Sequence, residues 1–180
     1  MYKNILLLIL ALFLGFAFYA VLTQVSKSSK SKRVECQTKT ITFEKIFTEK
    51  PILEAVKQLK LGNYEIISNI EYSKQMKSHL IEIFNKEKSD ELLNEILKKY
   101  ITTNTKNSNG VLIDYYIYEN DKEDTNKKNA EAKSYAGYLL FEFKYNNEVV
   151  YKIQTDYKDV NATDINERMD CVISSFTSLN

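Results

Sequence analysis

The longest apolar stretch of the chain lies near its N-terminus. Residues 5–22 contain no charged side chain and are predominantly Leu, Ile, Phe and Ala. As a helix, this segment would span about 27 Å, which is close to the hydrocarbon thickness of a bilayer. A cleaved signal peptide is the alternative, but the best cleavage position, after Ala20, has bulky Phe18 where a small residue is preferred. The pattern therefore predicts a retained N-terminal transmembrane anchor over residues 1–24.

Beyond a polar linker, the pattern predicts one globular domain over residues 34–180. A first strand is expected over 37–47, followed by a helix that starts near Pro51 and ends at Gly62. Residues 64–72 alternate well enough for a strand, although a short helix also fits. Apolar residues at helical spacing then predict helices over 76–84 and 89–100, the second with Ser89 as its N-cap.

The second half of the domain predicts a sheet and a last helix. Alternation of apolar and polar residues indicates a three-stranded antiparallel meander over 111–118, 135–145 and 149–157. Asn146 and Asn147 tolerate positive φ and suit the turn between its last two strands. Residues 162–179 carry apolar side chains at helical spacing and predict a C-terminal helix on the sheet. The expected fold class is therefore α+β, an antiparallel sheet packed by amphipathic helices.

The polar linker, residues 25–33, is a basic tether whose charge bears on topology. It carries four basic residues, whereas only Lys3 precedes the apolar segment. The positive-inside rule by itself would place the domain in the cytoplasm. A very short basic N-terminus before an apolar core is instead typical of exported proteins. The cysteines and a modification motif described below also favour export, so we expect a periplasmic domain, with a cytoplasmic domain as the alternative.

Composition argues against a nucleic-acid partner and indicates the kind of genome that encodes the chain. The chain has 25 basic and 24 acidic residues, a formal net charge of +1. Nucleic-acid-binding proteins carry a clustered basic excess, so no nucleic-acid partner is expected. Abundant Tyr, Lys, Asn and Ile indicate an AT-rich bacterial genome, and the predicted anchor then lies in a bacterial inner membrane as a single pass.

Two cysteines bracket the domain, Cys36 at its start and Cys171 in its last helix. No C-x-x-C motif is present and His79 is the sole histidine, so neither a metal site nor a cofactor is expected. We assign His79 to a helix edge or to the surface. In an oxidising compartment Cys36 and Cys171 would form a disulfide that closes a loop of about 135 residues. Two unpaired thiols in a cytosolic chain are the alternative.

A five-residue motif precedes the C-terminal helix. Asp159, Asn161 and Thr163 have the spacing of an acidic residue two before an Asn and a hydroxyl residue two after it, with no intervening Pro. The motif resembles the extended acceptor sequon of bacterial N-linked glycosylation. That resemblance makes Asn161 the acceptor, with Asp159 and Thr163 as its determinants. The alternative is a helix start with Asn161 as N-cap and Asp164 three residues later.

Two further clusters carry weaker signals. Residues 119–133 form a charged stretch in which Glu119, Asp121, Glu123 and Asp124 invite a calcium site. The stretch lacks the Gly and the closing Glu of an EF-hand loop, so we expect a solvated loop.

Tyrosines gather on the predicted sheet, and eight of the thirteen fall between residues 115 and 157. Tyr115, Tyr116, Tyr118 and Tyr138 are candidate interface residues, because tyrosine supplies contact area and a hydrogen bond at low entropy cost. Adjacent Tyr115 and Tyr116 must point to opposite faces of the strand. The alternative is a half-buried sheet with tyrosines at its rim.

No phosphate loop, nucleophile elbow or zinc-protease motif is present, so we expect no enzymatic activity. The favoured function is a non-catalytic protein-interaction module, anchored in the inner membrane and part of an envelope assembly such as a flagellar motor or a secretion machine. A periplasmic small-ligand or lipid-binding domain is the alternative.

Overall fold

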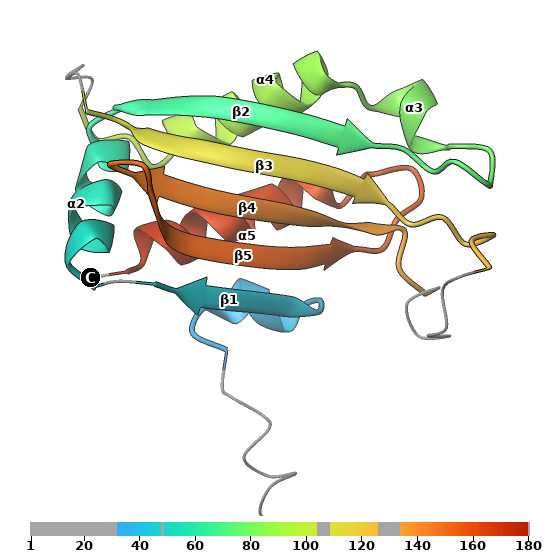
Figure 1. Ribbon diagram of the computed structural model, residues 1–180, viewed down its shortest axis with the longest axis horizontal. Helices are drawn as coiled ribbons and strands as arrows, with labels where there is room; N and C mark the ends of the chain where they lie inside the picture. The colour runs from blue at the N-terminus through green and yellow to red at the C-terminus, as the bar shows by residue number, and fades with distance from the viewer. Residues whose placement is uncertain (1–31, 48, 104–108, 126–133, 180) are drawn as a thin grey trace, which may run out of the picture. The chain divides into compact units, whose positions relative to one another are not determined.

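A five-stranded sheet with helices packed on one face forms the core of the computed structural model (Figure 1). The structure describes residues 32–47, 49–103, 109–125 and 134–179. The helical elements in these ranges are η1 (Glu35–Thr38, a 3-10 turn), α2 (Glu49–Lys60), α3 (Leu80–Ile83), α4 (Lys86–Lys98) and α5 (Ile165–Thr177). The strands are β1 (Thr42–Ile46), β2 (Tyr64–Glu71), β3 (Val111–Glu119), β4 (Gly137–Tyr145) and β5 (Glu148–Tyr157).

The sheet is mixed, with strand order β1-β5-β4-β3-β2. The expected meander is confirmed, because β3, β4 and β5 are neighbours in antiparallel pairs. The expectation of an antiparallel sheet throughout is wrong at β2, which pairs with β3 in parallel. Parallel neighbours need a crossover connection, and α3 and α4 supply it between β2 and β3. The fold is therefore α+β with a mixed sheet.

The hairpin between β4 and β5 follows from its sequence. Asn146 and Asn147 both adopt positive φ, 52° and 64°, as a tight two-residue turn between twisted strands requires. Every second residue of β4 is buried, from Gly137 to Tyr145, and β3 shows the same period. One face of the sheet therefore supplies the core.

The helices close this buried face. In Figure 1, α4 and α5 lie behind the sheet. Phe176 of α5 stacks on Phe143 of β4, with ring centroids 4.0 Å apart. Tyr115 of β3 stacks on Phe141 of β4 at 4.7 Å. The apolar residues expected to form the inner stripe of the C-terminal helix are all buried: Ile165, Met169, Val172, Phe176 and Leu179.

The crossover differs from the sequence prediction in two places. The helix expected over 76–84 is reduced to α3, because the backbone N–H groups before it donate to carboxylates at the end of β3. Helix α4 begins at Lys86 with Asn85 as its N-cap, whose side chain accepts the N–H of Lys88. Ser89, the expected cap, is buried and hydrogen bonds Tyr115 instead.

The compact unit runs from Arg33 to Asn180. None of the helices in the described ranges combines the length and the apolar character needed to cross a membrane. The predicted anchor, residues 5–22, and most of the tether lie outside those ranges.

Candidate functional site

The uncovered face of the sheet, which we call the open face, is the candidate functional site. It is the face toward the viewer in Figure 1. Its residues alternate with the core residues and are half-buried rather than buried. On the three central strands they are Leu112, Asp114, Tyr116, Tyr118, Tyr138, Leu140, Glu142, Lys144, Lys152, Gln154 and Asp156.

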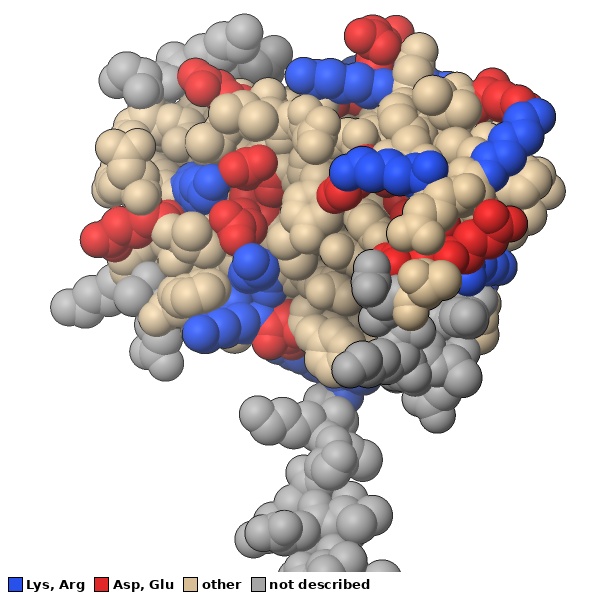
Figure 2. Space-filling model, turned by 45° about the vertical axis from the view of Figure 1, so that its right-hand side comes forward, with Lys and Arg blue, Asp and Glu red and all other residues tan. Residues whose placement is uncertain are grey.

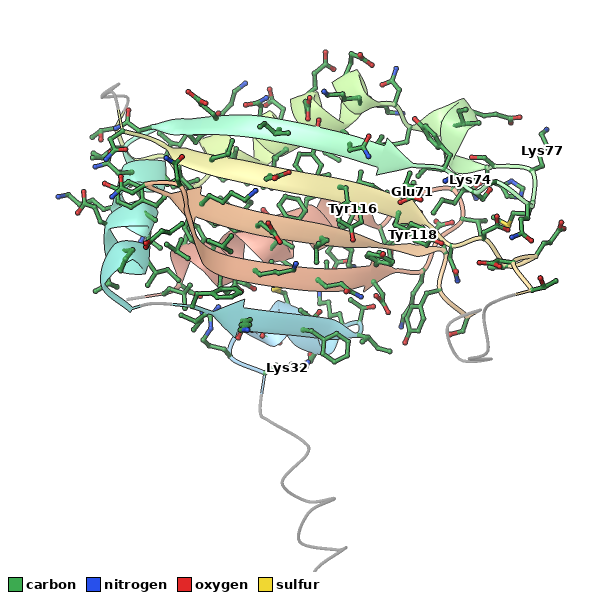
Figure 3. All side chains as sticks on the ribbon, in the orientation of Figure 1. Lys32, Glu71, Lys74, Lys77, Tyr116 and Tyr118 are labelled. Carbon is green, nitrogen blue, oxygen red and sulfur yellow. A yellow bond between two sulfur atoms is a disulfide. The ribbon has the colours of Figure 1, made fainter. Side chains whose placement is uncertain are left out.

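Three tyrosines gather at one end of the open face, and with Leu140 they form what we call the tyrosine patch. Tyr118 and Tyr138 are direct cross-strand partners, and their rings stack with centroids 4.9 Å apart. Tyr116 meets Tyr138 edge to face at 5.9 Å, and their hydroxyl oxygens lie 3.4 Å apart. Figure 3 shows Tyr116 and Tyr118 on the face of the sheet that is turned to the viewer.

Two acidic residues flank this patch. Pairing across the sheet places Glu71, Tyr118, Tyr138 and Asp156 in one row over four strands. Burial, the hydrogen bond with Tyr116 and the negative charge of Glu71 all raise the pKa of Tyr138, so its phenol stays protonated and keeps a hydrogen to donate. Burial likewise raises the pKa of Asp156. The row therefore presents stacked phenols between two carboxyl groups.

The middle of the open face carries a ladder of ion pairs. Lys144 Nζ lies 2.6 Å from Asp114 Oδ2 and 3.5 Å from Glu142 Oε2, and Lys152 Nζ lies 2.7 Å from Glu142 Oε1. The hydrogen bond to Asp114 is the largest cause that raises the pKa of Lys144. Basic and acidic side chains also lie side by side over the surface seen in Figure 2. Because its lysines already bond carboxylates, this region offers little to a charged ligand.

Beyond the patch, two carboxylates hold the connection between β2 and α3, and we call this pair the acidic clamp. Glu119 Oε1 accepts the N–H groups of His79 and Leu80 at 2.9 and 3.1 Å. Its Oε2 accepts the N–H of Ser73 at 3.0 Å and the hydroxyl of Ser78 at 2.6 Å. Since Glu119 directly follows Tyr118, the clamp holds this connection at the end of β3 that carries the patch.

Asp121 completes the clamp. Its carboxylate accepts the N–H groups of Lys74, Gln75 and Met76 at 2.9, 2.5 and 3.1 Å. Glu119 and Asp121 are only 4% and 6% exposed, so the expectation of a solvated acidic loop is wrong for these two residues. Burial by itself would raise the pKa of each carboxyl. The backbone N–H donors lower it by more than burial raises it, and at Glu119 the Ser78 hydroxyl adds to this effect. Both pKa values are therefore below their usual range.

The acidic clamp holds the connection after β2 beside the tyrosine patch. Figure 3 shows Lys74 near Glu71 on the connection after β2, and Lys77 farther along the same connection. Lys74 Nζ lies 3.6 Å from Glu71 Oε1, and both side chains are largely exposed. His79 is exposed, in agreement with its assignment to a helix edge or the surface.

At the opposite edge of the sheet, the start of the domain is fastened to α5. The sulfurs of Cys36 and Cys171 lie 2.01 Å apart and their Cα atoms 5.7 Å apart, the separation of a disulfide bond. Arg33 donates to both carboxylate oxygens of Glu44, at 3.2 and 2.8 Å, and to the carbonyl of Ser175 at 2.6 Å. Arg33, expected as the last residue of the tether, is therefore part of the domain.

Glu44 is held in its charged form by this network. Its carboxylate also accepts the hydroxyl of Tyr151 at 2.5 Å and the amide of Gln37 at 3.0 Å. Burial raises the pKa of Glu44, but the hydrogen bonds from Arg33, Tyr151 and Gln37 outweigh that effect and lower it. The chain thus leaves this edge of the domain from a fixed position.

The predicted site residues lie on the open face, in the core and in the turn before α5. Tyr116, Tyr118 and Tyr138 come together on the open face. Tyr115 is only 1% exposed and bonds Ser89 and Asp90, so its assignment to an interface is wrong: adjacent residues of a strand face opposite sides, and Tyr115 takes the core side.

Asn161 lies ten residues before Cys171, between β5 and α5. It is exposed in the turn before α5, and the N-cap of that helix is Asp164. The alternative assignment of Asn161 as N-cap is therefore wrong.

Two exposed apolar residues of the open face were missed by sequence reasoning. Phe43 of β1 is 63% exposed and pairs with Gln154, and Ile67 of β2 is 54% exposed and pairs with Asp114. Both lie on edge strands, where the outward side chain has a neighbouring strand on one side only. Adjacent Phe43 and Thr42 must face opposite sides of a strand, but strand period does not indicate which side the helices cover.

Two hollows in the described part of the domain bear on the ligand-binding alternative. One, of about 510 Å³, lies along α3 and the start of α4, and the other, of about 530 Å³, lies by Asn109 and Lys144. Both open to solvent, and charged or amide side chains line much of each, in contrast to an enclosed apolar ligand cavity. Among the described residues, no group of three or more His, Cys, Asp or Glu side chains is placed to hold a metal ion.

Comparisons with protein-family models, curated proteins and solved structures found no match to this chain.

Proposed function

We propose that this domain is the non-catalytic interaction module of a membrane-anchored envelope protein, and that a protein partner docks on its tyrosine patch. The observation that carries the proposal is the packing of Tyr116, Tyr118 and Tyr138 against one another on a sheet face that α4 and α5 leave uncovered. Residues 5–22 anchor the chain in the inner membrane, and the domain lies in the periplasm.

Tyrosine is suited to this task. A phenol ring buries a large area on contact while it loses few rotatable bonds, and its hydroxyl then bonds a polar group of the partner. The contacts of Tyr138 with Tyr116 and Tyr118 hold the rings in place before any partner arrives, which lowers the entropy lost on binding. Phe43 and Ile67 extend the apolar area over the edge strands.

The charge around the patch defines the chemistry of the partner. Glu71 and Asp156 lie at the two ends of the row that contains Tyr118 and Tyr138. A Lys or Arg side chain of the partner would meet the face of a phenol ring and a flanking carboxylate together. We therefore propose a partner surface with a basic side chain among apolar ones.

Export is supported by features at two ends of the domain. Cys36 and Cys171 lie at bonding distance, and disulfides persist in the periplasm rather than in the cytosol. The motif around Asn161 lies at the surface, where an envelope enzyme would meet it.

Crosslinking in intact membranes tests the proposal. The full chain carrying Tyr116→Ser and Tyr118→Ser is compared with the wild type and with Leu53→Ser, a matched change of an exposed apolar residue on α2. We expect wild type and Leu53→Ser to retain the same crosslinked protein, and the tyrosine variant to lose it while it keeps the wild-type circular dichroism spectrum. Equal recovery by all three chains, or recovery by none, would overturn the proposed docking site.

A further inference from the structure

The turn between β5 and α5 carries the modification motif, and the residues of the motif hydrogen bond one another. Asp159 Oδ1 accepts the backbone N–H of Asn161 at 2.9 Å, and its Oδ2 accepts the hydroxyl of Thr163. Asp164 closes the same turn from the other side, where its carboxylate accepts the N–H groups of Lys158 and Asp159. The acceptor and its two determinants are thus brought together by hydrogen bonds within the motif, outside the core.

Asn161 itself is left available by this arrangement. It is exposed, and its side-chain amide has no hydrogen-bond partner among the described residues, in contrast to Asn63, Asn85 and Asn94, whose side chains bond neighbouring groups. Adjacent Val160 is 43% exposed, so an enzyme can approach the turn from solvent.

The motif is also unique in the chain. Of its 16 Asn residues, only Asn161 has a Ser or Thr two positions later. The same Asn has the acidic residue two positions before it. The hydrogen bonds from Thr163 and from the N–H of Asn161 lower the pKa of Asp159, which keeps this determinant anionic at neutral pH.

We infer that Asn161 is a glycosylation acceptor in the folded domain, which takes an oligosaccharide from a lipid-pyrophosphate donor. In the transfer, Asn161 Nδ2 forms a bond to the anomeric carbon of the first sugar, and the bond from that carbon to the pyrophosphate oxygen breaks. The lipid pyrophosphate leaves with the bonding electrons and the amide nitrogen gives up one proton, so no oxidation or reduction takes place. The enzyme must break the Asp159–Thr163 hydrogen bond to hold both determinants, and this opening changes only the surface turn.

A substitution at Ala162 changes the backbone of the turn but keeps the acceptor and its two determinants. Ala162 has a φ of 58°, in the left-handed region that favours glycine. Ala162→Gly keeps Asp159, Asn161 and Thr163 in place and relieves this backbone, so it should be modified at least as fully as the wild type.

The site requires the exported topology of the proposed function, but it does not depend on the tyrosine patch. Its failure is therefore distinguishable from that of the docking site, because one is read by mass and the other by crosslinking. Protease accessibility of the domain in spheroplasts, measured on the same cells, separates a wrong topology from a wrong acceptor.

The test expresses the full chain in a bacterial host that has a periplasmic oligosaccharyltransferase selective for acidic sequons and its lipid-linked oligosaccharide. A reporter protein with an established sequon is expressed in the same cells. Tryptic peptide 159–168 should carry the mass of one oligosaccharide in the wild type and in the matched control Asn166→Gln. It should be unmodified in Asn161→Gln, in Asp159→Asn and in Thr163→Val, whereas Thr163→Ser restores the modification.

The contrary results are equally defined. An unmodified wild-type peptide, from a domain that protease reaches and in cells that modify the reporter, overturns the acceptor assignment alone. Modification that persists in Asn161→Gln also overturns it. A domain that protease cannot reach overturns the exported topology, and with it both proposals.

Discussion

The ring of Tyr118 stacks on the ring of Tyr138 across β3 and β4, with centroids 4.9 Å apart and planes at 27°. The two residues are direct partners in the strand register, on the side of the sheet opposite the core. Glu119 follows Tyr118 and holds the connection after β2 through its carboxylate. The patch is therefore built on rigid strands and bordered by a connection that is itself hydrogen bonded, which suits a surface that must keep its shape until it is bound.

The acidic clamp should make the stability of the domain depend on pH in the acid range. The folded-state pKa of Glu119 is lowered, so its contribution is complete above the pKa of the unfolded chain and is lost as pH falls through the folded value. Glu119→Gln should lower the free energy of unfolding at neutral pH by about 2–4 kcal/mol, since buried N–H groups lose a charged acceptor. Urea unfolding of the purified chain between pH 7 and pH 3 measures both effects.

The control for the clamp is Glu123→Gln, which changes an exposed carboxylate of the same loop. This variant should follow the wild-type pH profile, whereas Glu119→Gln should show a shallower loss of stability on acidification. Identical profiles for Glu119→Gln and the wild type would contradict the role assigned to the clamp.

The bond between Cys36 and Cys171 should contribute substantially to stability, because it closes a loop with a sequence separation of 135 residues. In the chain-entropy account such a link contributes at most about 5 kcal/mol, and measured values are often smaller. We expect Cys36→Ser with Cys171→Ser to lower the free energy of unfolding by about 2–5 kcal/mol. Reductant should lower the unfolding midpoint of the wild type and leave that of the double variant unchanged. A wild type indifferent to reductant would refute the bond.

Gly137 has no room for a side chain. A Cβ at this position would lie 2.0 Å from the carbonyl oxygen of Tyr118 and 2.5 Å from the ring of Tyr157. Gly137→Ala should therefore cost about 3 kcal/mol in unfolding free energy, because the strand backbone must move. Adding Tyr157→Leu removes the ring but not the carbonyl, so it should not restore stability. Full rescue by this second change would show that the ring alone sets the constraint.

Tyr115 and Tyr116 should separate a core tyrosine from a surface one. Tyr115→Phe removes a hydroxyl that lies 2.6 Å from Ser89 Oγ and 2.8 Å from Asp90 Oδ1, and should lower the unfolding free energy by about 1–2 kcal/mol. Tyr116→Phe on the open face should change it by less than about 0.5 kcal/mol. Partner recovery should be unaffected by Tyr115→Phe, and a selective loss of recovery in that variant would contradict the assignment of the two faces.

Much of this fold could be predicted wherever apolar residues recur at a regular strand or helix spacing. The alternation in 135–157 and the Asn146–Asn147 turn defined the hairpin, and the helical spacing from Ile165 to Leu179 defined the last helix. In contrast, the three isoleucines of β2 fit a strand or a short helix equally well. The parallel pairing of β2 with β3 depends on the crossover through α3 and α4, and the spacing of apolar residues does not predict which strands pair.

The site could be predicted only in part, because it depends on partners distant in sequence. Strand alternation placed Tyr115 and Tyr116 on opposite faces, but the face covered by α4 and α5 emerged only from their packing. Glu119 and Asp121 appeared as charge in a loop, since the N–H donors on the connection after β2 lie 39 to 47 residues earlier in the chain. Asn85 was passed over as a cap because Ser89, a residue type equally suited to capping, lies just after it.

The most direct test of the docking surface is residue-specific photo-crosslinking from within the patch. A photoreactive amino acid replaces Leu140, which lies between Tyr116 and Gln154 in the strand register, and in a matched chain it replaces exposed Leu53 of α2. We predict that the probe at position 140 forms an adduct with one envelope protein in intact membranes and that Tyr116→Ser with Tyr118→Ser abolishes it. The probe at position 53 should form no such adduct. An adduct with this protein from position 53 and none from position 140 would contradict the assignment of the tyrosine patch as the docking surface.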